Sequence, residues 1–101
     1  MINYPHSSDR EKGITLKAFL IAHNLTVNVT QYIAADGTVG YISRIANCEV
    51  KVGSTMLKGE YGSGKTSMRA VRDYQVRIDG QTLVINAMND GRKEIAVPRL
   101  R

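Results

Sequence analysis

The sequence of 101 residues has no tryptophan, one phenylalanine, two prolines and one cysteine. A lone cysteine, Cys48, excludes a disulfide within the chain and is typical of a reducing compartment, so we expect a cytoplasmic protein. Cys48 alternates with Val50 and Val52, which predicts a small buried side chain and not a reactive thiol. Only two histidines, His6 and His23, accompany it, and their spacing is not that of a metal site.

Long apolar runs are also absent. The longest, from Ile14 to Ala22, contains Lys17 and is too short to cross a bilayer, so no membrane span is expected. Residues 1–12 contain no apolar run of the kind found in signal peptides. No catalytic set of Ser, His and Asp, of Cys and His, or of paired carboxylates stands out. The sequence therefore favours a non-catalytic protein, with a small nuclease that uses His6 or His23 as a third alternative.

The positive charge is confined to one half of the chain. Residues 1–50 carry four basic and four acidic side chains, whereas residues 51–101 carry ten basic and five acidic ones, so the whole net charge of +5 lies in the second half. Such a bias predicts an acidic partner, either nucleic acid or an acidic protein surface. The alternative is that the basic residues only keep a small protein soluble. The length and the 43% hydrophobic content predict one globular domain over residues 1–101.

The apolar pattern predicts one helix near the amino terminus. After an extended lead-in at residues 1–13, Leu16, Phe19 and Leu20 recur at helical spacing, and His23 lies at the edge of this stripe. Asn24 is a residue that tolerates the left-handed conformation at which helices end. A helix over residues 14–24 is expected, with His23 as a partly buried structural residue.

From residue 26 the apolar period changes to two, which predicts an antiparallel sheet up to residue 98. The first turn, Ala35-Asp36-Gly37, predicts a three-residue hairpin loop, and the second, Gly53-Ser54, a two-residue loop. The strand pairs expected from these two turns are Ile33–Val39, Gln31–Tyr41, Val50–Leu57 and Glu49–Lys58.

The segment 68–78 fits a helical stripe and a strand face equally well. Asp79-Gly80 is a strong two-residue hairpin signal and favours the strand, and Asn89-Asp90-Gly91 predicts a further hairpin. The pairs expected from these two turns are Val76–Leu83, Tyr74–Ile85, Ile85–Ile95 and Leu83–Val97. The predicted fold is α+β and mainly antiparallel β, with one N-terminal helix, a meander of six or seven strands or a small barrel, and a basic tail at 99–101.

The octet from Gly59 to Thr66 matches the phosphate-loop pattern GxxxxGK[ST]. A nucleotide-binding loop needs a buried strand before the first glycine and a helix after the Lys-Thr pair, and enough chain for a parallel sheet. Here a turn signal precedes the octet, a strand is predicted after it, and about 35 residues remain. We interpret the match as chance in a β-hairpin loop, with no nucleotide cofactor. A weaker use remains, in which backbone N–H groups of the loop and Lys65 receive a phosphate.

Basic and aromatic residues cluster between positions 58 and 77. Lysine and arginine neutralise phosphates, and an exposed tyrosine stacks on an unpaired base. The predicted binding residues are Lys58, Tyr61, Lys65, Arg69, Arg72 and Arg77. The predicted function is a non-catalytic module that contacts nucleic-acid phosphates through the loop and strand of residues 58–77. The alternatives are an adaptor or inhibitor that engages an acidic protein surface, and a merely solvated charged strand face.

Overall fold

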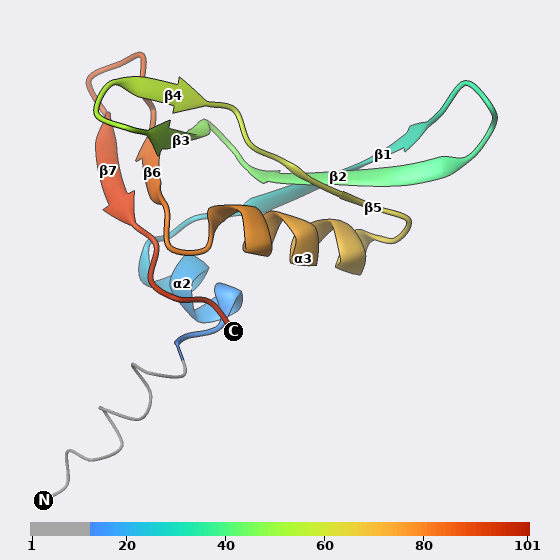
Figure 1. Cartoon of the computed structure of the whole chain (residues 1–101), viewed down its shortest axis with the longest axis horizontal. Coiled ribbons are helices and arrows are strands. Elements are labelled where there is room, and N and C mark those ends of the chain that lie inside the picture. The colour runs from blue at the N-terminus through green and yellow to red at the C-terminus, as the bar shows by residue number, and fades with distance from the viewer. Residues whose placement is uncertain (1–12) are drawn as a thin grey trace, which may run out of the picture.

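The computed structural model describes residues 13–101. Within this range the chain forms two helices and seven strands, and the second helix lies between strands (Figure 1). The elements are α2 (Leu16–Ala22), β1 (Val27–Ile33), β2 (Val39–Ile45), β3 (Cys48–Val52), β4 (Met56–Lys58), β5 (Gly62–Gly64), α3 (Ser67–Ile78), β6 (Thr82–Ile85) and β7 (Lys93–Ala96).

The strands form two open antiparallel sheets and not a barrel. One sheet has the order β1-β2-β5 and the other the order β4-β3-β6-β7. The chain passes from the first sheet to the second between β2 and β3, where Asn47 adopts a left-handed φ of 54°. The fold is thus a small α+β domain, in which α3 covers β2 and β5 of the first sheet (Figure 1).

The hydrophobic core lies at one end of the molecule. It joins α2, the carboxyl-terminal half of α3 and the inner face of the second sheet, and its most enclosed large side chains include Phe19, Tyr74, Ile78 and Leu83. The β1–β2 hairpin extends away from this core, as Figure 1 shows, and Ile33 near its tip is 73% exposed. The hairpin therefore presents side chains to solvent at a distance from the core.

The prediction of the first helix is confirmed. The hydroxyl of Thr15 accepts a hydrogen bond from the Ala18 N–H at 3.1 Å and caps the helix, as its side chain is suited to do. Asn24 has a φ of 55°, and the Leu25 N–H returns to the Leu20 carbonyl at 2.9 Å. The lead-in expected at residues 1–13 lies, apart from Gly13, outside the described residues.

The carboxyl-terminal segment is more than a basic tail. Leu100 is buried, and its N–H donates to the Asp79 carboxylate at 2.8 Å. The Arg101 N–H donates to the Ile14 carbonyl at 3.0 Å, so the segment lies beside the start of the described chain. None of the helices within residues 13–101 has the length and apolar character required to cross a membrane.

The strand predicted over residues 68–78 is wrong, because this segment forms α3. Thr66 caps the helix by accepting the Arg69 N–H at 3.1 Å. Gly80, with a φ of 72°, ends it, and the Gln81 N–H donates to the Ile78 carbonyl at 3.0 Å. Asp79-Gly80 is thus a helix terminator and not a hairpin turn. The pairs Val76–Leu83 and Tyr74–Ile85 that depended on that turn do not form, and the expected single N-terminal helix and the continuous sheet over 26–98 are wrong.

The other hairpin registers are confirmed in part. The pairs Ile33–Val39 and Gln31–Tyr41 are present as predicted. The second hairpin has a three-residue loop, so its register differs by one residue from the prediction. The Val50–Leu57 and Glu49–Lys58 pairs are both wrong, since Val50 pairs with Lys58. The last hairpin differs by two residues, since Leu83 pairs with Ile95. A shift of two keeps every side chain on its predicted face, and Leu83, Ile85, Ile95 and Val97 are all buried together as expected.

Candidate functional site

The contact between β5 and α3 positions the residues of the predicted site. A Cβ atom on Gly62 would overlap the Ala70 carbonyl oxygen and the Tyr74 nitrogen, and one on Gly64 would lie 2.7 Å from Arg69 Cβ. Only glycine lets the helix backbone approach the strand this closely. Gly64 of the phosphate-loop pattern, and Gly62 within it, therefore serve helix–strand packing, whereas a Cβ atom on Gly59 would meet no neighbouring atom within 4 Å.

Buried hydrogen bonds fix α3 against β2 at the same place. The Ser43 hydroxyl donates to the Ala70 carbonyl at 2.7 Å, and the Tyr74 hydroxyl accepts the Ile45 N–H at 3.1 Å. Burial raises the pKa of the Tyr74 hydroxyl, so it stays neutral and able to hold this N–H at any physiological pH. The start of α3 is consequently held in a fixed position on the first sheet.

The anion-binding nest expected in the glycine loop does not form. Gly62 and Gly64 lie in extended strand and pair with Ser43 and Tyr41 of β2. The Ser63 N–H between them donates to the Asp73 carboxylate at 2.9 Å, so a protein group already occupies the place of an anion. The octet thus provides no phosphate-wrapping loop, although the helix that follows its Lys-Thr pair was not expected.

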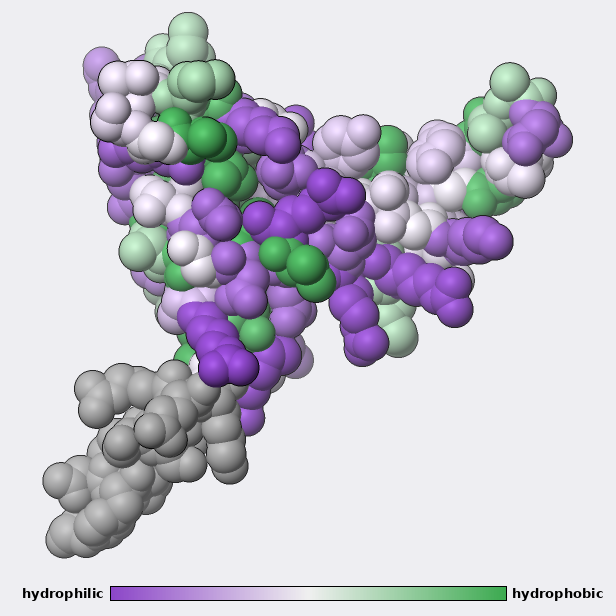
Figure 2. Space-filling model, viewed as in Figure 1, coloured by the Kyte–Doolittle hydropathy of each residue, from purple (hydrophilic) through white to green (hydrophobic). Residues whose placement is uncertain are grey.

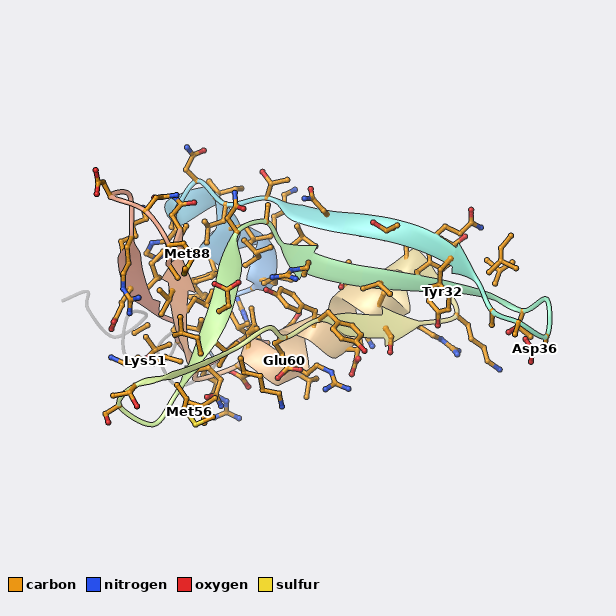
Figure 3. All side chains as sticks on the ribbon, turned by 90° about the horizontal axis from the view of Figure 1, so that it is seen from above. Tyr32, Asp36, Lys51, Met56, Glu60 and Met88 are labelled. Atoms are coloured by element: carbon orange, nitrogen blue, oxygen red, sulfur yellow. The ribbon has the colours of Figure 1, made fainter. Side chains whose placement is uncertain are left out.

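Two of the six predicted residues are neutralised by neighbouring carboxylates. Arg77 contacts Asp73 at 3.0 Å and Glu60 at 3.2 Å, and Lys58 lies 3.6 Å from Glu60. Figure 3 shows Glu60 on the connection between β4 and β5, beside α3. These contacts raise the pKa of the Arg77 guanidinium, chiefly through the hydrogen bond to Asp73. The positive charge of Lys58 and Arg77 is therefore largely balanced within the protein.

Three other predicted residues make no ion pair with any residue of the range 13–101. They are Lys65, Arg69 and Arg72, which we name the α3 cationic cluster. Lys65 immediately precedes the helix, and Arg69 starts from the flank of α3 that meets β5. Arg72 lies on the other flank, where it lines a shallow groove of about 380 Å³ with Val29 and Met68. Figure 2 shows hydrophilic side chains extending from this part of the molecule, below the hairpin.

A tyrosine that the sequence prediction missed lies beside the cluster. Tyr32, 42% exposed, and Lys65 both line a pocket of about 440 Å³, at the place where β5 ends and the edge of β2 that faces away from β1 loses its partner strand. The ring covers Gly40, its partner on β2, and lies on the projecting part of the hairpin (Figure 3). The sequence did contain a signal for this residue, because the expected hairpin register places an aromatic residue directly opposite a glycine, and such rings often cover the glycine. The predicted Tyr61 is also exposed, on the connection that leads into β5.

The remaining candidate groups are structural. Burial raises the pKa of the Cys48 thiol to about 11, so this side chain is a neutral part of the core, as predicted. His23 packs against Phe19, with 4.8 Å between the ring centroids and an angle of 49° between the ring planes, and it is partly buried, also as predicted. Residues 13–101 contain no group of three or more His, Cys, Asp or Glu side chains able to hold a metal ion.

Comparison of the chain with protein-family models, with curated proteins and with solved structures finds no match.

Proposed function

We propose that the protein is a non-catalytic binding module that holds nucleic-acid phosphates with the α3 cationic cluster. The observation that carries this proposal is the division of the basic residues between 58 and 77. Lys58 and Arg77 are paired with Glu60 and Asp73, whereas Lys65, Arg69 and Arg72 have no carboxylate partner among the described residues. Cations that have no carboxylate partner and lie close together in the chain are a usual means of phosphate binding.

The helix strengthens the positive potential of the cluster. Its N-terminal N–H groups carry a partial positive charge, and no acidic residue lies in its first turn. Thr66 satisfies the N–H of Arg69, whereas the N–H groups of the exposed residues Ser67 and Met68, in the first turn, have no partner within the helix. A phosphate placed there would interact with these N–H groups together with Lys65 and Arg69.

Two exposed tyrosines favour a ligand with unpaired bases. Tyr32 shares its pocket with Lys65, so a base stacked on the ring would keep its phosphate near that ammonium group. Tyr61 remains a second predicted stacking residue. Stacking on exposed rings requires a splayed base, which single strands and loops provide more easily than a duplex does.

The proposal is tested by the binding of labelled single- and double-stranded DNA and RNA of random sequence, measured by fluorescence anisotropy at several salt concentrations. We expect affinity to fall steeply as salt increases, and the substitutions Lys65→Ala, Arg69→Ala and Arg72→Ala each to reduce the slope of log K against log salt by about one. Lys51→Ala is the matched control, because Lys51 is paired with Glu94 on the second sheet.

The absence of binding at low salt to all four nucleic acids would end this proposal. Equal losses of nucleic-acid affinity in Lys51→Ala and Arg69→Ala would also contradict it. Binding would then depend on the net charge of the protein and not on the α3 cationic cluster. Tyr32→Ala distinguishes the ligand classes: it should weaken binding to single strands more than binding to duplexes.

A second candidate function, an adaptor or inhibitor that covers an acidic protein surface, is favoured by one observation. Val29 and Met68 are exposed apolar residues beside Arg72 in the same groove, and a protein partner would cover them as well as the charge. Retrieval of one stoichiometric protein from lysate after nuclease treatment, lost in Met68→Asp, would support this candidate over nucleic acid.

A further inference from the structure

Strand β1 has a free edge over its whole length. In the sheet order β1-β2-β5 it pairs only with β2, and all of its residues except Val27 are exposed. Its sequence, VNVTQYI, has high β propensity and contains none of the lysines, prolines or bulges that usually protect an edge from pairing with another strand. No other element in residues 13–101 hydrogen-bonds along this edge.

Alternate residues of β1 form backbone hydrogen bonds with β2, and the residues between them direct their N–H and C=O groups outward. We call this alternation the hydrogen-bond phase of the strand. The Ala34 N–H donates to the Thr38 carbonyl, so hydrogen-bonded pairs with β2 continue at every second residue, at Tyr32, Thr30 and Asn28. The Ile45 N–H, opposite Val27, is directed away from β1 to the Tyr74 hydroxyl, which gives the same phase. The N–H and C=O groups of Val27, Val29, Gln31 and Ile33 therefore point away from the sheet.

We propose that a second copy of the chain pairs with β1 in the antiparallel direction, about a two-fold axis at Thr30. This alignment is the one in which all seven residues of β1 have a partner. It pairs Val27 with Ile33, Val29 with Gln31, Asn28 with Tyr32 and Thr30 with Thr30. The first two of these pairs join residues whose backbone groups all face outward, so the hydrogen-bond phase fits without adjustment.

The chemistry of the strand favours a second copy as its occupant. The chain has a net charge of +5, yet β1 carries no charged side chain, so the two copies meet where they do not repel each other. The exposed Ile33 side chain gains an apolar neighbour in Val27 of the other copy, on the face that carries α3. A two-fold axis requires a self-complementary surface, and a strand with Val and Ile at opposite ends and Thr at its centre satisfies this condition.

The mass in solution, measured by sedimentation equilibrium over a range of protein concentrations, tests the proposal. We expect a dimer that Thr30→Lys and Thr30→Glu each abolish, because like charges would lie directly opposite at the axis. A mixture of the two variants should regain the dimer, since each pair then joins opposite charges. Thr55→Lys, at an exposed threonine in the β3–β4 turn, is the matched control and should dimerise as the unaltered chain does.

A cysteine at the axis tests the register. The Cα atoms of a pair that is not hydrogen-bonded lie at a separation that a disulfide can bridge, so Thr30→Cys should form a disulfide-linked dimer under oxidation. Asn28→Cys should not, because Asn28 faces Tyr32 in the proposed register. The native Cys48 is buried and does not interfere. A chain that is monomeric at all concentrations, a dimer insensitive to Thr30→Lys, or equal crosslinking at both positions would overturn the proposal.

Discussion

Gly62 shows how a single residue decides the architecture around the predicted site. It lies where β5 meets α3, and a Cβ atom at this position would overlap backbone atoms of Ala70 and Tyr74. These neighbours are helix backbone and cannot rotate away as a flexible side chain could. Any side chain at this position must separate the helix from the strand.

We predict that Gly62→Ala lowers the free energy of unfolding by about 3 kcal/mol, the upper part of the range for overpacking a tight contact. Gly59→Ala is the control, because a Cβ atom there meets nothing within 4 Å and the residue has no left-handed φ. Urea denaturation followed by circular dichroism measures both. Equal effects at the two positions would show that β5 and α3 are not in close contact.

At the residue scale, the sequence predicted those features that depend on the residue type alone. Burial of Cys48 and the left-handed conformation of Asn24 were both predictable. The close contact at Gly62 was not, because it depends on which segment crosses it. Two positions of the phosphate-loop match have structural roles: Gly64 lets β5 approach α3 closely, and Thr66 caps that helix.

At the scale of elements, Asp73 connects the strand and the helix that carry the cluster. Its carboxylate accepts the Ser63 N–H of β5 at 2.9 Å and pairs with Arg77 of α3. These interactions, first the hydrogen bond from Ser63 and then that from Arg77, hold the pKa of Asp73 below the ordinary aspartate value of 3.8. The unfolded chain therefore binds more protons than the folded chain as the pH falls through this range.

The sign of the effect on stability follows from that difference. Asp73 contributes its full stabilisation above about pH 3.8, and this contribution decreases as the pH falls toward the lower pKa of the folded state. We expect Asp73→Asn to be less stable than the unaltered chain at pH 7 and to lose less stability between pH 7 and pH 3. Denaturant unfolding at the two pH values measures the difference. Asp90→Asn is the control, because this carboxylate has no partner among the described residues. Its stability should decrease between pH 7 and pH 3 by as much as that of the unaltered chain.

The prediction of α3 as a strand has a physical explanation. Its buried residues Ala70, Tyr74 and Ile78 are spaced by four, and a spacing of four places residues on one face of a helix and also of a strand. The pattern could not separate the two, and the prediction depended on Asp79-Gly80. That pair ends helices as well as it turns hairpins. The signal that would have decided correctly was Thr66 at one end of the segment together with Gly80 at the other.

At the scale of the whole molecule, two ion-paired cations of the second sheet lie apart from the α3 cationic cluster. Lys51 and Arg92 both contact Glu94 on the second sheet, where the Lys51–Glu94 pair spans β6. The α3 cationic cluster lies at the start of the helix that covers the first sheet. The sequence predicted the excess of positive charge but not the pairing of Lys51, because Lys51 and Glu94 are 43 positions apart in the chain.

This separation allows net charge to be distinguished from a site. Arg69→Gln with Arg72→Gln, and Lys51→Gln with Arg92→Gln, each reduce the formal net charge of +5 by two. We expect the first double variant to lose most of the affinity for nucleic acid at physiological salt, since two phosphate contacts disappear, and the second to retain it. The exposed pairs lost in the second variant contribute little to stability, so both chains should fold, and circular dichroism checks this. Equal losses in the two variants would mean that the protein attracts polyanions only through its overall charge, without a phosphate site at the start of α3.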